Sequence, residues 1–150
     1  MSRIIMNMDR GWKFHRGDID ANIKSSHSSD YASSKAGNAQ GPAGRVWNDT
    51  DWRVVDLPHD YYAESEMHAD CRHSHGYRVE DNAWYRKRFS LPEGCVNKRI
   101  LLRFDGIAGN STIYLNGCLL HHNYSSYNTF ELDISDLVYR NKDNILAVYV

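Results

Sequence analysis

The sequence has no excess charge of either sign and no long apolar run. Its 150 residues include 18 Lys and Arg against 19 Asp and Glu, a formal net charge of -1. Such a chain has no basic field with which to displace the counterions of a polyphosphate, so we expect no nucleic-acid partner. The longest aliphatic runs, near Ile100 and Ile145, are far shorter than the ~18 apolar residues of a membrane-spanning helix. We therefore expect no membrane partner either.

Cysteine is also scarce. Cys71, Cys95 and Cys118 are odd in number and widely spaced, and no C-x-x-C motif occurs. Neither a disulfide framework nor a thiol redox site is expected. The apolar residues 4–6 at the N-terminus are fewer than the roughly 7 to 15 of a signal peptide. Cytoplasmic and exported locations are both compatible with this sequence.

Aromatic residues are plentiful, and the apolar positions alternate with polar ones. Aromatic side chains make up 12% of the chain, too many for a disordered protein. In residues 84–91, Tyr85 and Phe89 fall on one face, whereas Arg86 and Arg88 fall on the other. This period of two is typical of a half-buried strand with its polar face in solvent. Because it recurs along the chain far more often than a period of 3.6, we predict an all-β protein without long helices.

Two further segments indicate how the strands are arranged. Asn116-Gly117 separates two apolar runs, which predicts a tight hairpin, since both turn residues must take positive φ. Residues 144–150 are apolar on both faces, which predicts a central strand. The expected core consists of the apolar positions on one side of each strand: Tyr85, Phe89, Ile100, Leu102, Phe104, Ile113, Leu115, Phe130, Leu132, Ile134, Leu146 and Val148.

Two stretches have the composition of loops. Residues 22–45 are rich in Ser and Gly, and we expect them to form a long irregular excursion on the surface. Residues 57–83, rich in His, are expected to form a second one. Loops of this length on a compact domain often carry function. The final strand runs to Val150 without a turn or cap, from which we expect the chain to be a fragment of a longer protein.

Several short motifs occur in a familiar order. They are Gly11-Trp12-Lys13-Phe14, Asp51-Trp52-Arg53-Val54-Val55-Asp56-Leu57-Pro58-His59-Asp60, Trp84-Tyr85-Arg86-Lys87, Tyr114-Leu115-Asn116-Gly117 and Phe130-Glu131-Leu132-Asp133-Ile134-Ser135. In this order and spacing the chain resembles the N-terminal sugar-binding domain of family 2 glycoside hydrolases. The run ending in His59-Asp60 is more similar to β-galactosidases than to β-glucuronidases or β-mannosidases.

The resemblance implies a fold for this chain and a separate domain for catalysis. The fold would be a jelly-roll β-sandwich of the galactose-binding-domain type, followed in the intact protein by an immunoglobulin-like sandwich and a TIM-barrel catalytic domain. A retaining glycosidase needs two carboxyl groups roughly 5 to 5.5 Å apart, and in this family both belong to the barrel. The resemblance therefore implies no catalytic residue, metal or cofactor in this chain. Its partners would be a β-galactoside carbohydrate and the protein's own downstream catalytic domain.

Three residues are candidates for contact with sugar at the rim of a substrate pocket. The Asp60 carboxylate can accept hydrogen bonds from sugar hydroxyls, with His59 beside it. Alternatively, Asp60 bonds nearby backbone N–H groups in a turn that Pro58 initiates. Trp84 offers an aromatic platform, although a strand tryptophan more often fills a core.

The pattern His68-x-x-Cys71-x-His73-x-His75 contains residue types that bind zinc. Its spacing matches no closed structural zinc site, since such sites usually pair ligands from two separated turns. We therefore interpret it as a solvated loop.

Overall fold

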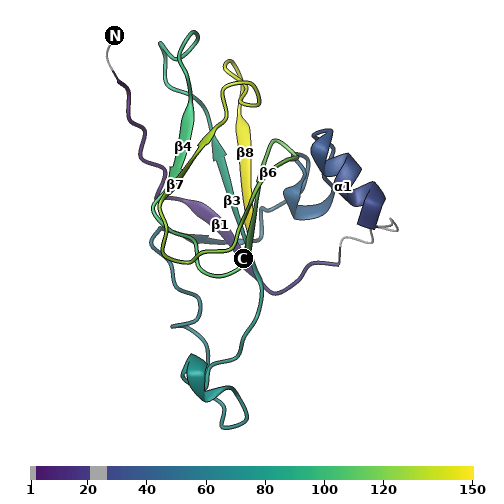
Figure 1. Ribbon diagram of the computed structural model, residues 1–150, viewed down its shortest axis with the longest axis vertical. Coiled ribbons are helices and arrows are strands. Elements are labelled where there is room, and N and C mark those ends of the chain that lie inside the picture. The colour runs from purple at the N-terminus through teal and green to yellow at the C-terminus, as the bar shows by residue number, and fades with distance from the viewer. Residues whose placement is uncertain (1–2, 21–26) are drawn as a thin grey trace.

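The computed structural model describes residues 3–20 and 27–150 and consists mainly of two antiparallel sheets (Figure 1). The larger sheet has the order β2 (Arg53–Val55), β1 (Trp12–Arg16), β3 (Ala83–Phe89), β8 (Asn144–Tyr149), β5 (Ser111–Leu115) and β6 (Cys118–Asn123). The smaller sheet pairs β4 (Leu101–Phe104) with β7 (Phe130–Asp133). The predicted all-β sandwich is confirmed.

The core lies between these two sheets. All twelve predicted core positions belong to it: eight are buried, and Ile100, Phe104, Phe130 and Leu132 are partly buried against them. Strand β8 lies between β3 and β5, so the central position predicted for this segment is also confirmed. The prediction missed Trp12 and Phe14 of β1, which are 3% and 6% exposed.

The predicted hairpin joins β5 to β6. Asn116 and Gly117 have φ values of 55° and 84°, which is the left-handed geometry that such a turn requires. The Asn116 side chain is buried, where its Nδ2 donates to the Leu137 carbonyl and to Asn144 Oδ1, while its Oδ1 accepts from the Ile145 amide. The turn residue thus also holds the start of β8 in place.

The expectation for residues 22–45 is partly wrong, because this stretch contains helix α1 (His27–Lys35) and the 3₁₀ turn η1 (Gly41–Ala43). Residues 22–26 lie outside the described residues. The helix has no apolar stripe that periodicity could detect. Asp30 in its first turn and Lys35 in its last complement the helix dipole.

Figure 1 shows α1 and the β4–β7 pair on opposite sides of the larger sheet. No helix in the described chain is long and apolar enough to cross a membrane.

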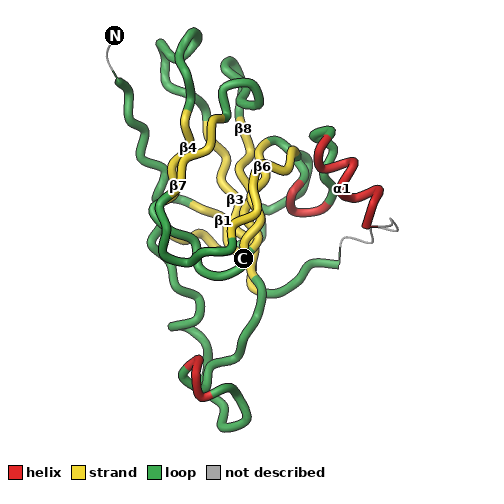
Figure 2. The backbone as a smooth tube through the Cα atoms, in the orientation of Figure 1, coloured by secondary structure: helices red, strands yellow, loops and turns green. Residues whose placement is uncertain are grey.

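Residues 57–83 are irregular, as predicted. Apart from Ala83, the first residue of β3, they contain only an isolated bridge between Met67 and Arg78 and the 3₁₀ turn η2 (His73–His75). Figure 2 shows this stretch extending away from the sheets as loop, with η2 near its far end.

The expectation of a solvated polar face on β3 is wrong at Arg86. Arg86 does lie on the face of β3 away from the core, but it is 1% exposed. Residues 41–49 cross this outer face and cover it. The guanidinium donates to Asp49 Oδ2 at 2.9 Å, to the Gly44 carbonyl at 3.0 Å and to the Pro42 carbonyl. Burial lowers the pKa of Arg86, and the bond to Asp49 opposes this shift.

Substituting Arg86 tests how strongly the covering segment depends on it. We expect Arg86→Ala to lower the free energy of unfolding by about 3 kcal/mol, because Asp49 and two carbonyls lose a buried partner. Arg88→Ala is the matched control on the same face of β3, since Arg88 and its partner Asp143 are 61% and 50% exposed. It should cost less than about 1 kcal/mol. Urea unfolding of both variants measures the difference, and equal costs would contradict this role.

Candidate functional site

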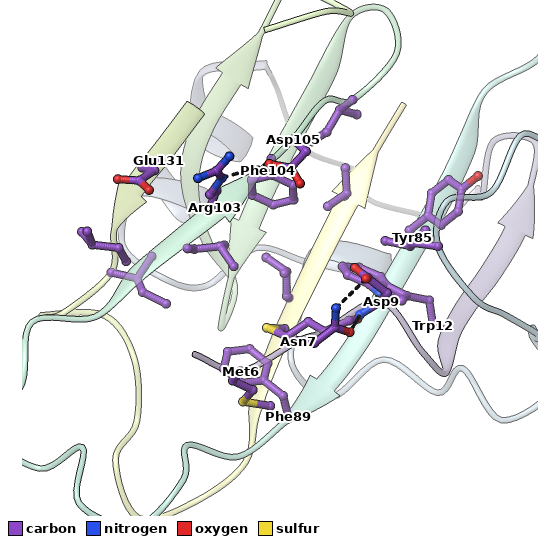
Figure 3. Close-up of a pocket in the computed structure, with 18 of the residues that line it drawn as sticks. Met6, Asn7, Asp9, Trp12, Tyr85, Phe89, Arg103, Phe104, Asp105 and Glu131 are labelled. Atoms are coloured by element: carbon purple, nitrogen blue, oxygen red, sulfur yellow. Dashed lines mark hydrogen bonds and ion pairs between the residues drawn. The ribbon is translucent and has the colours of Figure 1, made fainter. Parts of the chain in front are cut away.

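A hollow of about 1630 Å³ opens between the inner face of the larger sheet and the β4–β7 pair. Figure 3 shows Trp12, Tyr85 and Phe89 on one side of it, with Arg103, Phe104 and Glu131 on the other. The volume exceeds the roughly 300 to 1,000 Å³ of a small-molecule pocket, and core residues form much of the lining. A small ligand would therefore contact only part of this hollow.

Residues 57–62 and Tyr85 form one part of the lining of the hollow. Asp60 is exposed there, and its Oδ1 accepts the amides of Tyr62 at 3.0 Å and Ala63 at 3.2 Å. The turn considered as an alternative for Asp60 is thus present. Oδ2 accepts no hydrogen bond from any residue that the structure describes. One carboxylate oxygen holds the loop, and the other is available to a ligand.

His59 points inward, and its side chain is only 10% exposed. Its ring meets Phe14 edge-on at 4.7 Å between centroids, while Nδ1 lies 2.7 Å from the Tyr85 hydroxyl and Nε2 lies 2.7 Å from Arg53 Nη2. Nε2 also lies 3.2 Å from Glu64 Oε1. Toward Arg53, whose guanidinium can only donate, Nε2 is an acceptor, whereas toward the Glu64 carboxylate it is a donor, so the tautomer of the ring decides which of these two contacts is a hydrogen bond. His59 lines the hollow, but both of its ring nitrogens have protein partners, so its role is to anchor the loop.

Sequence analysis missed Arg53 and Glu64, which complete this network. Arg53 Nη2 donates to both Glu64 oxygens, at 2.7 and 2.9 Å. This hydrogen bond, with a smaller contribution from His59, lowers the pKa of Glu64. Burial raises the pKa of Tyr85, so its hydroxyl keeps its proton. Nothing in the sequence marks two charged residues eleven positions apart as partners, because the pairing depends on how the loop folds back onto β2.

The structure does not bring Trp84 together with His59 and Asp60. Neighbouring strand residues point to opposite faces, and Tyr85 belongs to the core. Trp84 lies on the outer face, half-buried, with its ring 4.8 Å from that of Tyr149. It neither fills the core nor lines the hollow.

The His-rich loop forms no cluster of three or more metal ligands in the residues described. His73 packs edge-on against the Tyr77 ring, with centroids 5.4 Å apart, and His68 lies 3.7 Å from Glu66 in an exposed pair.

Two carboxyl groups have clearly shifted pKa values, and both values are lowered. Hydrogen bonds lower the pKa of Glu64 and lower that of Asp133 to about 2. A glycosidase acid needs its pKa raised, so these two groups are not suited to that role.

Comparison with known proteins identifies the family. Residues 7–150 match the family described as glycosyl hydrolases family 2, sugar binding domain, and the chain belongs to it. It is 34% identical over 104 residues to the β-galactosidase BoGH2A of Bacteroides ovatus, an alignment that covers 68% of this chain and 12% of that protein. It is 29% identical over 109 residues to a β-glucuronidase of Formosa agariphila, covering 69% of this chain and 11% of that protein.

Solved structures agree with the sequence relatives. A family 2 glycosyl hydrolase from Bacteroides cellulosilyticus superposes with a TM-score of 0.79 at 31% identity, covering 97% of this chain and 17% of that one. A β-glycosidase from Bacteroides vulgatus gives a TM-score of 0.76 at 26% identity, with the same two coverages. The chain thus spans only a small part of the length of the proteins it matches.

The Arg53–Glu64 pair can be tested by titration against a second ion pair. The low pKa of Asp133 depends first on the hydrogen bond from the Ser135 hydroxyl and then on Arg99 Nε, which lies 2.7 Å away. We expect Arg53→Ala to raise the pKa of Glu64 toward its ordinary 4.5 and to leave that of Asp133 near 2. Arg99→Ala should leave the pKa of Glu64 low and raise that of Asp133 only part of the way toward its ordinary 3.8, because the hydrogen bonds with Ser135 remain. Carboxyl-carbon NMR shifts measured against pH give both values.

The sign of the linked stability follows from these depressed pKa values. The stabilisation from Glu64 is fully present above the carboxyl's unfolded pKa and is lost as pH falls through its lowered folded pKa. A Glu64 midpoint at 4.5 in the unsubstituted chain would contradict the pairing.

Proposed function

We propose that this chain is the non-catalytic N-terminal sugar-binding and scaffolding domain of a retaining family 2 glycosidase. The observation that carries the proposal is coverage, because almost the whole chain aligns with about a sixth of a much longer glycosyl hydrolase. The downstream part would supply the catalytic barrel, including both carboxylates of the retaining mechanism. The chain itself would buttress that barrel as its covalent partner.

For the intact enzyme we favour β-galactosidase activity on terminal β-galactosides. The run from Asp51 to Asp60 resembles β-galactosidases, and the B. ovatus β-galactosidase has higher identity than the F. agariphila β-glucuronidase. Both activities occur among the relatives, and one fold supports many specificities. The residues that distinguish a neutral sugar from a uronic acid would lie in the downstream domain.

Within this role, the loop that carries His59 and Asp60 would form one wall at the mouth of the active site. Asp60 Oδ2 would accept a sugar hydroxyl in a charge-assisted hydrogen bond. His59 would position Asp60 through its contacts with Arg53, Phe14 and Tyr85. A free-standing carbohydrate-binding module is the alternative, since a β-sandwich of this kind also serves that purpose.

The proposal predicts that the 150-residue chain alone is inactive on an aryl β-galactoside. We expect free galactose to bind at millimolar affinity or weaker, on the order of -4 kcal/mol, because one wall supplies few of the hydrogen bonds that a small ligand needs. A colorimetric assay measures hydrolysis of the aryl β-galactoside, and calorimetry measures the affinity for galactose. Turnover that survives repurification and disappears with a carboxylate substitution in this chain would overturn the first expectation. Micromolar galactose binding would favour the free-standing module.

The role of Asp60 is testable in the longer enzyme. We expect Asp60→Asn to lower kcat/KM roughly tenfold to a hundredfold, the equivalent of one charge-assisted hydrogen bond, because the amide oxygen still accepts from Tyr62 and Ala63 and preserves the loop. Asp56→Asn is the matched control, since Asp56 bonds the Gly11 amide and is not part of this hollow. Equal kcat/KM values for the two variants would show that Asp60 only stabilises its turn. Parallel aryl galactoside and glucuronide assays would determine the sugar.

A further inference from the structure

One cross-strand row on the outer face of the larger sheet contains no aliphatic side chain. Adjacent residues in the register are His15 and Trp84, then Trp84 and Tyr149, then Tyr149 and Thr112, then Thr112 and His122. The row therefore takes one residue from each of β1, β3, β8, β5 and β6. With neighbouring strands about 4.8 Å apart, it spans about 19 Å. We call these five residues the outer row.

The outer row lies beside the covered part of the outer face and is more exposed than that part. Residues 41–49 cover Arg86, and Ile145 and Ala147 of β8 are buried on the same face. One step along the strands, Trp84 and Tyr149 are only half-buried. His15 and Thr112 are also half-buried, and His122 is exposed.

The rings of the outer row contact further aromatic and polar groups. Trp84 lies 4.8 Å from the Tyr149 ring and 6.2 Å from the Tyr114 ring, between centroids. At the β1 end, Trp52 packs against His15 at 5.3 Å. At the other end, Tyr124 packs against His122 at 4.7 Å. Aromatic rings thus lie at both ends of the row, with Thr112 between Tyr149 and His122.

Hydrogen-bonding groups are placed along the same surface. Asp18 accepts from the Tyr149 hydroxyl at 2.5 Å and from Asn82 Nδ2 at 3.1 Å, so an exposed carboxylate borders the row. Thr112 Oγ1 lies 2.8 Å from His122 Nδ1. Aromatic faces next to carboxylate, hydroxyl and imidazole groups suit a ligand that is both apolar and rich in hydroxyls.

We propose that the outer row is a carbohydrate-binding surface, separate from the hollow, that takes several consecutive rings of a β-linked oligosaccharide. The ring C–H faces would stack on Trp84 and Tyr149, and the hydroxyls would bond the flanking polar groups. A nucleic-acid strand would also stack on aromatic rings, but the carboxylate of Asp18 beside the row disfavours a polyanion. The partly buried side chains of a single row offer little area against the ~800 Å² per partner of a stable protein interface.

The test measures binding of oligosaccharides to the 150-residue chain by calorimetry. The probes are β-1,4-linked galactotetraose, cellotetraose and xylotetraose, each compared with its own monosaccharide. At least one tetrasaccharide should bind at least tenfold more tightly than its monosaccharide, because several rings contact the row at once. If no tetrasaccharide gains over its monosaccharide, the proposal is wrong.

Variants locate the binding. We expect Trp84→Leu, which keeps an apolar side chain, and His122→Ala, at an exposed position, each to weaken tetrasaccharide binding at least tenfold. Tyr127→Ala is the matched control, because Tyr127 is 94% exposed on the loop between β6 and β7 and lies outside the row. Circular dichroism and thermal melting confirm that each variant is folded. If Trp84→Leu does not fold, His122→Ala still tests the row.

Asp60→Asn separates this surface from the proposed function. It should leave tetrasaccharide binding unchanged, whereas the outer-row variants should leave hydrolysis of a small aryl glycoside by the longer enzyme unchanged. Binding lost in Asp60→Asn but kept in Trp84→Leu would place the oligosaccharide in the hollow and overturn the proposal. Self-association in sedimentation that His122→Ala abolishes would also overturn it, since the row would then be a contact between two copies.

Discussion

The guanidinium of Arg86 requires hydrogen-bond acceptors in a place that water hardly reaches, and much of the outer face is organised around this requirement. A buried charge without partners is far too costly to keep, so Asp49 and the carbonyls of Pro42 and Gly44 must lie across the sheet. That crossing covers the outer face over the middle of β8, which explains why β8 is buried on both sides. It also divides the outer face into a covered half and the half that carries the outer row.

The sequence predicts the inner layer of this domain well and the outer layer poorly. Alternation of apolar residues identifies the core positions, and the Asn116-Gly117 pair predicts the hairpin, because both signals are local. Alternation says which face a residue takes but not what covers that face. Arg86 was therefore expected in solvent, although a segment 44 positions away buries it. Helix α1 was missed for a related reason, since its sequence has no apolar stripe to detect.

The candidate site, too, could be predicted only where its signals are local in the sequence. The motif around His59 and Asp60 was found from the sequence, and the turn at Asp60 was anticipated. Arg53 and Glu64, which determine how His59 is held, were not, because a pairing across a folded loop leaves no spacing signal. Residue type alone groups Trp84 with His59 and Asp60, but the structure places Trp84 on the opposite face of the sheet. Residue chemistry alone does not decide which surface of the domain a side chain belongs to.

The small β4–β7 sheet has a consequence for the shape of the hollow. Its two strands bond each other, with a further link from the Ile134 amide to the Ile100 carbonyl, but they share no ladder with the larger sheet. An isolated pair of strands is marginal in water, so this layer depends on side-chain packing against the core for its stability. Since the same pair forms one wall of the hollow, any contact that changes this packing also changes the width of the hollow.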